Sequence, residues 1–243
     1  MSKVGSAGEI QRLQWAIRAA LSSPLLDDIQ GFAWEAVFHF AKGLPLRDPL
    51  KQGKTKRLFD AVAPNAGVGW SLKAKQCGSR NSMRPQMNID FVIQRADIFT
   101  KSQELGLMNG LTKHSPPDIL GRAIVRLWNA KVREDMGKQE VRKPRLAVLL
   151  KSKDRRYYGY FETRLNDLDE SALVWQWAAE RRRGLQARDS RGILRLKWYP
   201  SGTQLFQCLS VPKDCAFFEV TPARVPMDLF VNFIGNLAGL APR

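Results

Sequence analysis

The stretch GVGWSLKAKQ, residues 67–76, has the two-residue alternation of a β-strand. Successive side chains of a strand point to opposite faces of its sheet. Trp70 and Leu72 would therefore lie together on an apolar face. The opposite face would carry three polar side chains, those of Ser71, Lys73 and Lys75. This pattern predicts a strand whose polar face is basic.

A second strand is expected just before this one. LFDAV at 58–62 contains strand-forming residues, and PNAG at 64–67 has the proline, asparagine and glycine of a tight turn. Strands joined by a short turn pair in antiparallel fashion. Asp60 would then lie on the strand next to Lys73. A third strand is predicted over 89–99, where the sequence reads IDFVIQRADIF.

Helices are predicted before and after these strands. Apolar residues recur at three- and four-residue spacing in 7–22, and the segment 27–42 begins with an acidic turn and ends at Gly43. The clearest helix covers 117–138 and has a proline at its first position. The later elements are a hairpin of 145–152 and 157–162, a helix at 169–183, two paired strands at 192–200 and 204–212, and a terminal helix at 226–240.

The order helix, three strands, helix, strand predicts the α/β class. Residues 1–165 would form the core together with the N-terminal helices. Residues 166–243 would form a C-terminal α+β extension that contacts nucleic acid, either as a separate region or as part of one continuous domain.

The charge balance points to a polyanionic partner. The 243 residues include 39 Lys and Arg against 23 Asp and Glu, a formal net charge of +16. The basic residues are spread along the chain from position 42 to position 224, which is typical of a folded surface with a strong positive field. Nucleic acid is therefore the expected partner. A membrane surface is the alternative, but it would need a free helix with one apolar and one basic face, and the sequence contains none.

Cysteine and histidine usage argues against a disulfide framework and against a zinc or histidine-ligated metal centre. The three cysteines are an odd number and contain no CxxC pair, which is not typical of a disulfide framework or a zinc knuckle. The two histidines, His39 and His114, are too few for a histidine-ligated metal centre. The first residues lack the uninterrupted apolar run of a signal peptide, because Arg12 and Arg18 interrupt it. We expect a cytoplasmic protein in a reducing environment.

The pairing of Asp60 with Lys73 suggests a specific chemistry. Hydrolysis of a phosphodiester needs a divalent cation, a positioned water, and a base or cation beside that water. Mg²⁺ prefers oxygen ligands and usually takes only one or two protein carboxylates. One or two acids and a lysine are therefore a sufficient set of protein groups.

These residues resemble the PD-(D/E)xK nuclease superfamily, which includes many restriction endonucleases. In that family an aspartate on one strand and an acid-x-lysine on the next form the metal site, often with a glutamate from a preceding helix. The resemblance covers about residues 27–162. It implies a restriction-endonuclease-like core, which is a mixed central sheet flanked by helices. In this core Asp60 and Glu35 hold Mg²⁺, or Mn²⁺ as a substitute, and Lys73 orients or activates water.

Two positions depart from the family pattern. Ser71 stands where the family has Asp or Glu, and Leu58 and Phe59 precede Asp60 where the family has proline. A serine hydroxyl is a poor ligand for Mg²⁺. Ser71 is therefore expected to be a hydrogen-bonding bystander in the catalytic site.

The sequence predicts a magnesium-dependent DNA endonuclease of type II restriction type that acts on double-stranded DNA as a homodimer. The alternative is a catalytically inactive nucleic-acid-binding subunit with the same fold, and the choice between DNA and RNA stays open. Arginine binds phosphates and guanine edges in bidentate fashion. The candidate nucleic-acid-binding residues are Lys75, Arg80, Asn81, Arg84, Arg181, Arg182, Arg183, Arg195 and Lys197.

Overall fold

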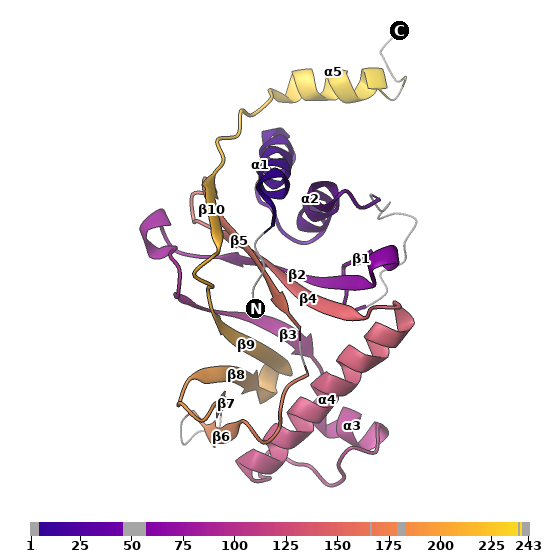
Figure 1. The fold of residues 1–243 in the computed structure, drawn as a ribbon, viewed down its shortest axis with the longest axis vertical. Helices are drawn as coiled ribbons and strands as arrows, with labels where there is room; N and C mark the ends of the chain where they lie inside the picture. The colour runs from indigo at the N-terminus through magenta and orange to yellow at the C-terminus, as the bar shows by residue number, and fades with distance from the viewer. Residues whose placement is uncertain (1–4, 46–56, 166, 179–182, 238, 240–243) are drawn as a thin grey trace. The chain divides into compact units, whose positions relative to one another are not determined.

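A computed structural model describes residues 5–45, 57–165, 167–178, 183–237 and 239. Within these residues the chain has five α-helices and two five-stranded sheets, so the predicted α/β class is confirmed (Figure 1). The chain divides into two units that are discontinuous in sequence. Unit 1 comprises residues 1–84, 143–164 and 212–243, and unit 2 comprises residues 85–142 and 165–211.

The sheet of unit 1 has the strand order β1-β2-β4-β5-β10. The strands are β1 (Ala61–Ala63), β2 (Val68–Gln76), β4 (Lys143–Lys151), β5 (Tyr157–Arg164) and β10 (Ala216–Glu219). Only β2 and β4 pair in parallel, and the other three pairs are antiparallel. The sheet is therefore mixed, with β2 and β4 near its centre.

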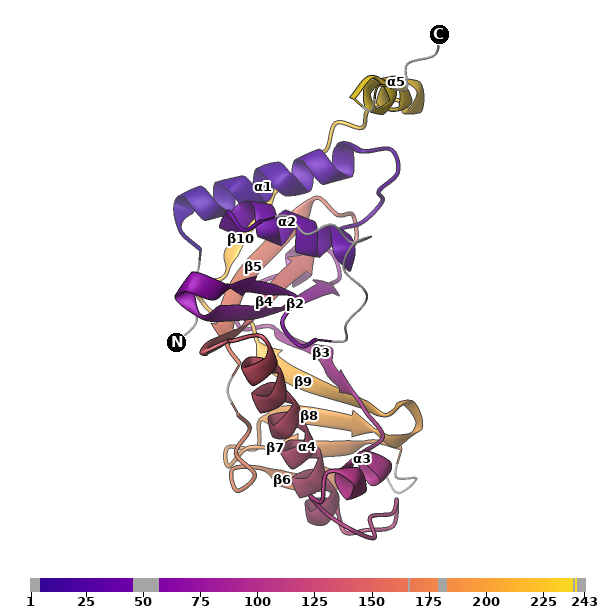
Figure 2. The same ribbon diagram turned by 90° about the vertical axis from the view of Figure 1, so that its right-hand side faces the viewer.

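Two helices cover one face of this sheet, as Figure 2 shows. They are α1 (Ala7–Ser22), which begins after the N-cap Ser6, and α2 (Phe32–Lys42), which ends at Gly43 in the left-handed conformation that glycine adopts without strain. The apolar stripes of both helices pack on Trp70 and Leu72 of β2. Those two side chains lie on the face that the alternation in 67–76 predicts to be apolar.

Unit 2 contains an antiparallel sheet of order β3-β9-β8-β7-β6. Its strands are β3 (Asn88–Arg95), β6 (Val174–Trp177), β7 (Leu185–Arg188), β8 (Leu194–Tyr199) and β9 (Gln204–Ser210). Helix α4 (Pro117–Lys138) contacts β6 and β7, and α3 (Ile98–Glu104) contacts α4. A Cβ atom on Gly121 would come within 2.3 Å of the Trp175 ring, so only glycine permits this close approach of α4 to β6.

Several predicted elements are confirmed. The helices over 7–22 and 117–138 have the predicted bounds, and the strands predicted at 145–152 and 157–162 form the antiparallel pair β4 and β5. The strands predicted at 192–200 and 204–212 are β8 and β9, which also pair. The terminal helix is α5 (Met227–Leu237).

Other predicted elements are shorter than expected. Helix α2 begins at Phe32 rather than at residue 27, and β1 begins at Ala61, so Asp60 immediately precedes the strand. The predicted third strand, 89–99, ends at Arg95, because Asp97 caps the N-terminus of α3. These boundaries depend on capping and pairing, which the apolar pattern alone does not specify.

Three predictions about strand pairing, one helix and the division of the chain differ from the structure. The strand β3 does not join β1 and β2 in one sheet, because its partner is β9 in unit 2. The helix predicted at 169–183 is wrong, because Val174–Trp177 forms β6 and buries Trp175 between exposed neighbours. The two units also differ from the expected division after residue 165, because 85–142 and 212–243 fall on the other side of it.

No helix among the described residues has both the length and the apolar character needed to cross a bilayer.

Candidate functional site

Asp60 lies at the start of β1, directly beside β2. Its backbone N–H donates to the carbonyl of Trp70 at 2.9 Å, and one of its carboxylate oxygens, Oδ2, accepts the N–H of Leu72 at 2.7 Å. The register of β1 with β2 begins at Ala61, which lies opposite Trp70, and Asp60 directly precedes it. Lys73 lies on the face of β2 opposite Trp70 and Leu72, because residues two apart on a strand share a face. The charges of Asp60 and Lys73 act on each other, so the two groups are neighbours.

Burial and mutual attraction set the protonation of this pair. Burial raises the pKa of Asp60, while the N–H of Leu72 and the positive charge of Lys73 act in the opposite direction without cancelling it. Burial lowers the pKa of Lys73, and the charge of Asp60 partly offsets that effect. Both groups therefore ionise less readily than they would in water. A lysine with a lowered pKa can give up or take a proton closer to neutral pH.

Ser71 is two positions before Lys73 on β2, so its side chain faces the same side of the sheet as Lys73. Only 1 % of Ser71 is exposed to solvent. A buried hydroxyl is a poor partner for a hydrated cation, because Mg²⁺ keeps several of its own waters. The bystander role of Ser71 stays a prediction, and Asp60 is the carboxylate of this strand pair.

Glu35 lies on α2, one helical turn before His39, whose Nε2 is 3.5 Å from the carbonyl oxygen of Asp60. Residues four apart on a helix share a face, so Glu35 is on the stripe of α2 that passes near Asp60. The charge that acts on the pKa of Asp60 is that of Lys73, and Glu35 is not among the groups that shift it. The structure therefore brings Asp60 and Lys73 together and leaves Glu35 half-buried on the neighbouring helix.

The site offers Mg²⁺ few protein ligands. Asp60 offers carboxylate oxygen, the hard ligand that Mg²⁺ prefers, and one carboxylate lies within the usual range for this ion. Within the part of the chain that the structure describes, no three His, Cys, Asp or Glu side chains are grouped so that they could hold a metal ion. Any bound Mg²⁺ would therefore take most of its ligands from water and substrate.

The basic residues predicted to bind nucleic acid in unit 1 follow the polar face of β2. Lys75 is half-buried on that strand, whereas Arg80 and Asn81, in the 3₁₀ turn η2 (Arg80–Ser82), and Arg84 after it are exposed. The Arg80 guanidinium lies 4.9 Å above the Tyr157 ring and forms an ion pair with Glu219. This surface is exposed and basic, although Arg80 already has an acidic partner.

The basic residues predicted in unit 2 have a different environment. Arg195 is 2.7 Å from Asp189, and Lys197 is 2.9 Å from Asp90, whose hydrogen bond raises the pKa of Lys197. Arg183 is exposed, and Arg181 and Arg182 lie outside the described residues. The charges of Arg195 and Lys197 are therefore already paired with acids of their own unit.

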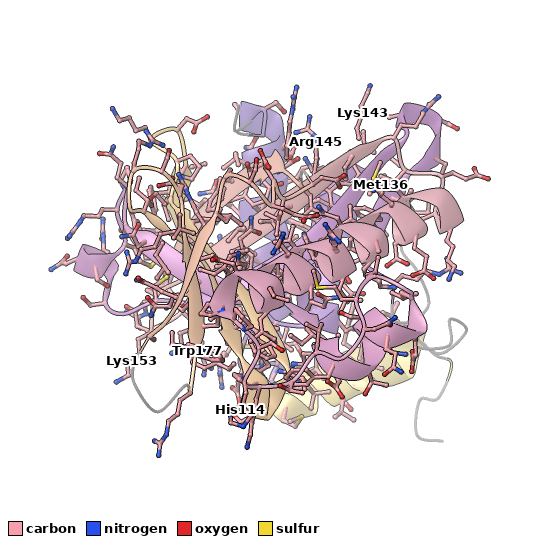
Figure 3. All side chains as sticks on the ribbon, turned by 90° about the horizontal axis from the view of Figure 1, so that it is seen from below. His114, Met136, Lys143, Arg145, Lys153 and Trp177 are labelled. Carbon is pink, nitrogen blue, oxygen red and sulfur yellow. The ribbon has the colours of Figure 1, made fainter. Side chains whose placement is uncertain are left out.

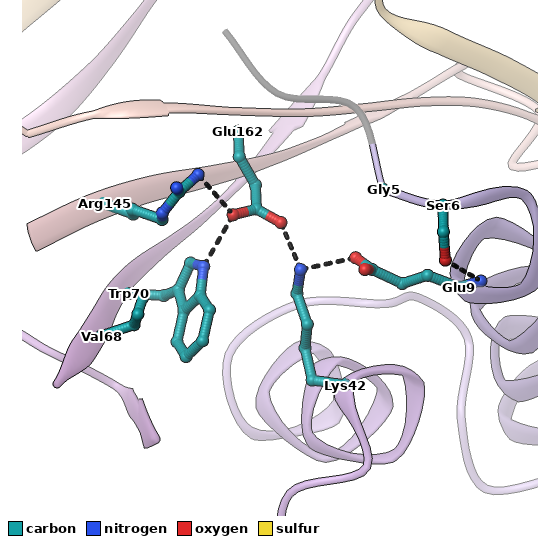
Figure 4. Close-up of a pocket in the computed structure, with 8 residues that line it drawn as sticks. All are labelled: Gly5, Ser6, Glu9, Lys42, Val68, Trp70, Arg145 and Glu162. Carbon is teal, nitrogen blue, oxygen red and sulfur yellow. Dashed lines mark hydrogen bonds and ion pairs between the residues drawn. The ribbon is translucent and has the colours of Figure 1, made fainter. Parts of the chain in front are cut away.

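A second group of charged residues in unit 1 was not predicted. The residues Gly5, Ser6, Glu9, Lys42, Val68, Trp70, Arg145 and Glu162 line a pocket of about 350 Å³ (Figure 4). The ammonium of Lys42 bridges two acids, Glu162 and, at 2.6 Å, Glu9. Glu162 is 3 % exposed and also accepts the Trp70 Nε1–H at 2.7 Å.

Hydrogen bonds keep Glu162 ionised inside the protein. Burial by itself raises the pKa of Glu162, but the charge of Lys42 and the hydrogen bonds from Lys42, Trp70 and Tyr160 outweigh it, so that this pKa is lowered. The pKa of Tyr160 is raised well above its ordinary value by burial and by the adjacent carboxylate. Glu162 was not among the site residues predicted from the sequence, and its partners Lys42 and Trp70 come from distant segments of the chain.

Arg145 is the cation of this pocket with the weakest acidic contact. Its guanidinium is 3.5 Å from Glu162. Lys143 and Arg145 are two positions apart on β4, so their side chains leave the same face of the strand, and both are labelled in Figure 3. The pocket is thus a paired network of acids and cations with one basic edge.

Comparisons of the whole chain with protein-family models, with curated proteins and with solved structures return no match. The arguments for function therefore come from the geometry of the chain itself.

Proposed function

We propose that this protein is a magnesium-dependent DNA endonuclease of restriction type, with Asp60 and Lys73 at its catalytic centre. The observation that carries the proposal is the neighbourhood of these two groups at β1 and β2, with Lys73 on the face of the unit 1 sheet opposite α1 and α2. A carboxylate and an amine at neighbouring strand positions are the protein groups that metal-assisted phosphodiester hydrolysis needs.

The fold of unit 1 supports the same proposal. It has a mixed sheet whose first two strands form the hairpin that carries Asp60 and Lys73, with two helices on one face. We take this sheet and its helices to be a restriction-endonuclease-like core. The net charge of +16 supports double-stranded DNA as the substrate, because phosphates attract a basic surface.

Each residue has a separate role in this proposal. Asp60 would hold Mg²⁺ or Mn²⁺, and the Leu72 N–H would keep its carboxylate oriented. Glu35, the second carboxylate that the sequence predicts, lies on α2, which covers the opposite face of the sheet from Lys73, so water and substrate would supply the remaining ligands. Lys73 would contact the phosphate or the attacking water, and its lowered pKa favours proton exchange with that water. The metal, when bound, would neutralise the charge that develops on the phosphate.

A second candidate function is binding of nucleic acid without hydrolysis. The burial of Ser71, in the place where the related nucleases have an acid, favours it, because that position then offers no metal ligand. In this case the pair of Asp60 and Lys73 would be a remnant of a catalytic site.

Incubation of supercoiled plasmid with the protein and Mg²⁺ distinguishes the two functions. The variants are Asp60→Asn and Lys73→Ala, and the matched control is Lys101→Ala, a change on the exposed surface of α3. Nicking that requires Mg²⁺, persists in the control and is lost in both site variants supports the endonuclease. Equal nicking by all four proteins would reject the site, because the activity would then come from elsewhere. Salt-sensitive binding without nicking in every protein would support the second candidate.

A further inference from the structure

Helix α5 is an apolar helix, and none of its residues is buried against the part of the chain that the structure describes. Seven of its eleven residues are apolar, and its three most polar residues, Asp228, Asn232 and Asn236, recur every four positions on one stripe. Six of the apolar side chains are 44–70 % exposed: Met227, Leu229, Val231, Phe233, Ile234 and Leu237. A helix of this length is barely stable alone in water, so it needs a surface on which to pack.

Unit 1 also has an exposed apolar surface on the outer side of its two helices. Trp15 of α1 is 60 % exposed and stacks on Phe40 of α2, with the ring centroids 5.1 Å apart. Leu25, in the connection between the helices, and Phe32, at the start of α2, are also exposed. We call these four residues the α1/α2 outer surface. Exposed patches of large apolar side chains often mark a contact surface.

The segment that leads into α5 is anchored next to the α1/α2 outer surface. The N–H of Val225 donates to the carbonyl of Ser22, at the end of α1, at 2.9 Å. Arg224 forms an ion pair with Asp27 at 2.6 Å. Helix α5 therefore begins beside the turn that carries Leu25, yet its own side chains and those of the α1/α2 outer surface are exposed in the same chain.

We propose that α5 of one copy packs on the α1/α2 outer surface of a second copy, and that the exchange is reciprocal. Both surfaces occur once per chain, so a two-fold axis pairs each with its complement and closes the assembly as a homodimer. Covering the apolar face of both α5 helices and the surfaces that receive them would bury on the order of 2,000 Å² in total, which meets the size of a stable interface. The interface does not depend on the proposed nuclease activity.

The first test is the mass of the full chain in solution, measured by light scattering after gel filtration. The wild type is expected at twice the 27.5 kDa of one chain. Phe233→Glu, on the apolar face of α5, is expected to run as a monomer, and Leu237→Glu should repeat the result. The matched control, Asn232→Glu, places the same charge on the polar stripe and should remain dimeric. A monomeric wild type would overturn the proposal, whether α5 then folds back on its own chain or binds phospholipid vesicles.

The second test distinguishes exchange from direct pairing of two α5 helices. Trp15→Glu should also give a monomer, since it places a charge in the surface that receives α5. An equimolar mixture of Trp15→Glu and Phe233→Glu keeps one intact contact, between the normal α5 of the first and the normal outer surface of the second. Heterodimers in that mixture are expected, and their absence would reject the exchange. A Trp15→Glu protein that stays dimeric would reject it as well.

Discussion

The ammonium of Lys42, at the end of α2, bonds the carboxylate of Glu162 on β5, a residue 120 positions later in the chain. Trp70 and Tyr160 each donate a hydrogen bond to the same carboxylate at 2.7 Å. These contacts join α2 to the strands β2 and β5 of the unit 1 sheet. Loss of the Glu162 carboxylate would leave the buried ammonium of Lys42 with one acidic partner fewer, so it should lower the stability of the fold.

Glu162→Gln is expected to destabilise the protein by about 2–4 kcal/mol, because breaking a buried, hydrogen-bonded ion pair leaves its partner uncompensated. In the variant Lys42 would still form its ion pair with Glu9, so the loss of stability is expected near the lower end of that range. Urea unfolding followed by tryptophan fluorescence measures the change. Glu134→Gln removes an exposed ion pair with Lys138 and should leave the unfolding free energy nearly unchanged. Equal effects of the two changes would contradict the role of Glu162.

Glu162 also gives the stability a predictable dependence on pH. Its pKa is lower in the folded protein than the ordinary 4.5, so its contribution is complete above about pH 4.5 and is lost as the pH falls through the folded pKa. Glu162→Gln lacks this contribution. Unfolding midpoints of the wild type and the variant should therefore differ at neutral pH and converge in acid. A constant difference down to pH 2 would show that Glu162 does not titrate in this way.

Asp60 has the opposite sign, because burial raises its folded pKa above the ordinary 3.8. Its ionisation therefore costs stability as the pH rises through that interval. Asp60→Asn, which keeps the shape without the charge, is expected to raise the melting temperature at pH 7 and to abolish Mg²⁺-dependent nicking. The gain should disappear below pH 3.8. Asp167→Asn, which affects only an exposed pair with Arg133, should leave the melting temperature nearly unchanged.

Two glycines of α4 provide a matched test of packing in unit 2. A methyl group at Gly121 would overlap the Trp175 ring, so Gly121→Ala should cost about 1–3 kcal/mol. Gly137 has open space around its Cβ position, and Gly137→Ala should stabilise α4 by up to about 1 kcal/mol. Urea unfolding compares the two. Similar effects would mean that α4 does not pack on β6 as closely as the structure indicates.

The sequence by itself determined those features that depend on residues close together in the chain. The helices α1 and α4 follow from apolar spacing with a cap or proline at their start, and β2 follows from its alternation. The neighbourhood of Asp60 and Lys73 was also predictable, since a short turn at 64–67 leaves the two strands almost no other way to pair.

Only the tertiary structure decided which distant segments meet. The alternation in β3 predicts a strand but does not identify β9 as its partner. The segment 169–183 was predicted to be a helix, but within it Val174–Trp177 forms β6, which contacts α4. The contact of Lys42 with Glu162 has no local signal. Such pairings are selected by the burial of whole faces and by the satisfaction of buried charges, which depend on the complete fold and not on any short window of sequence.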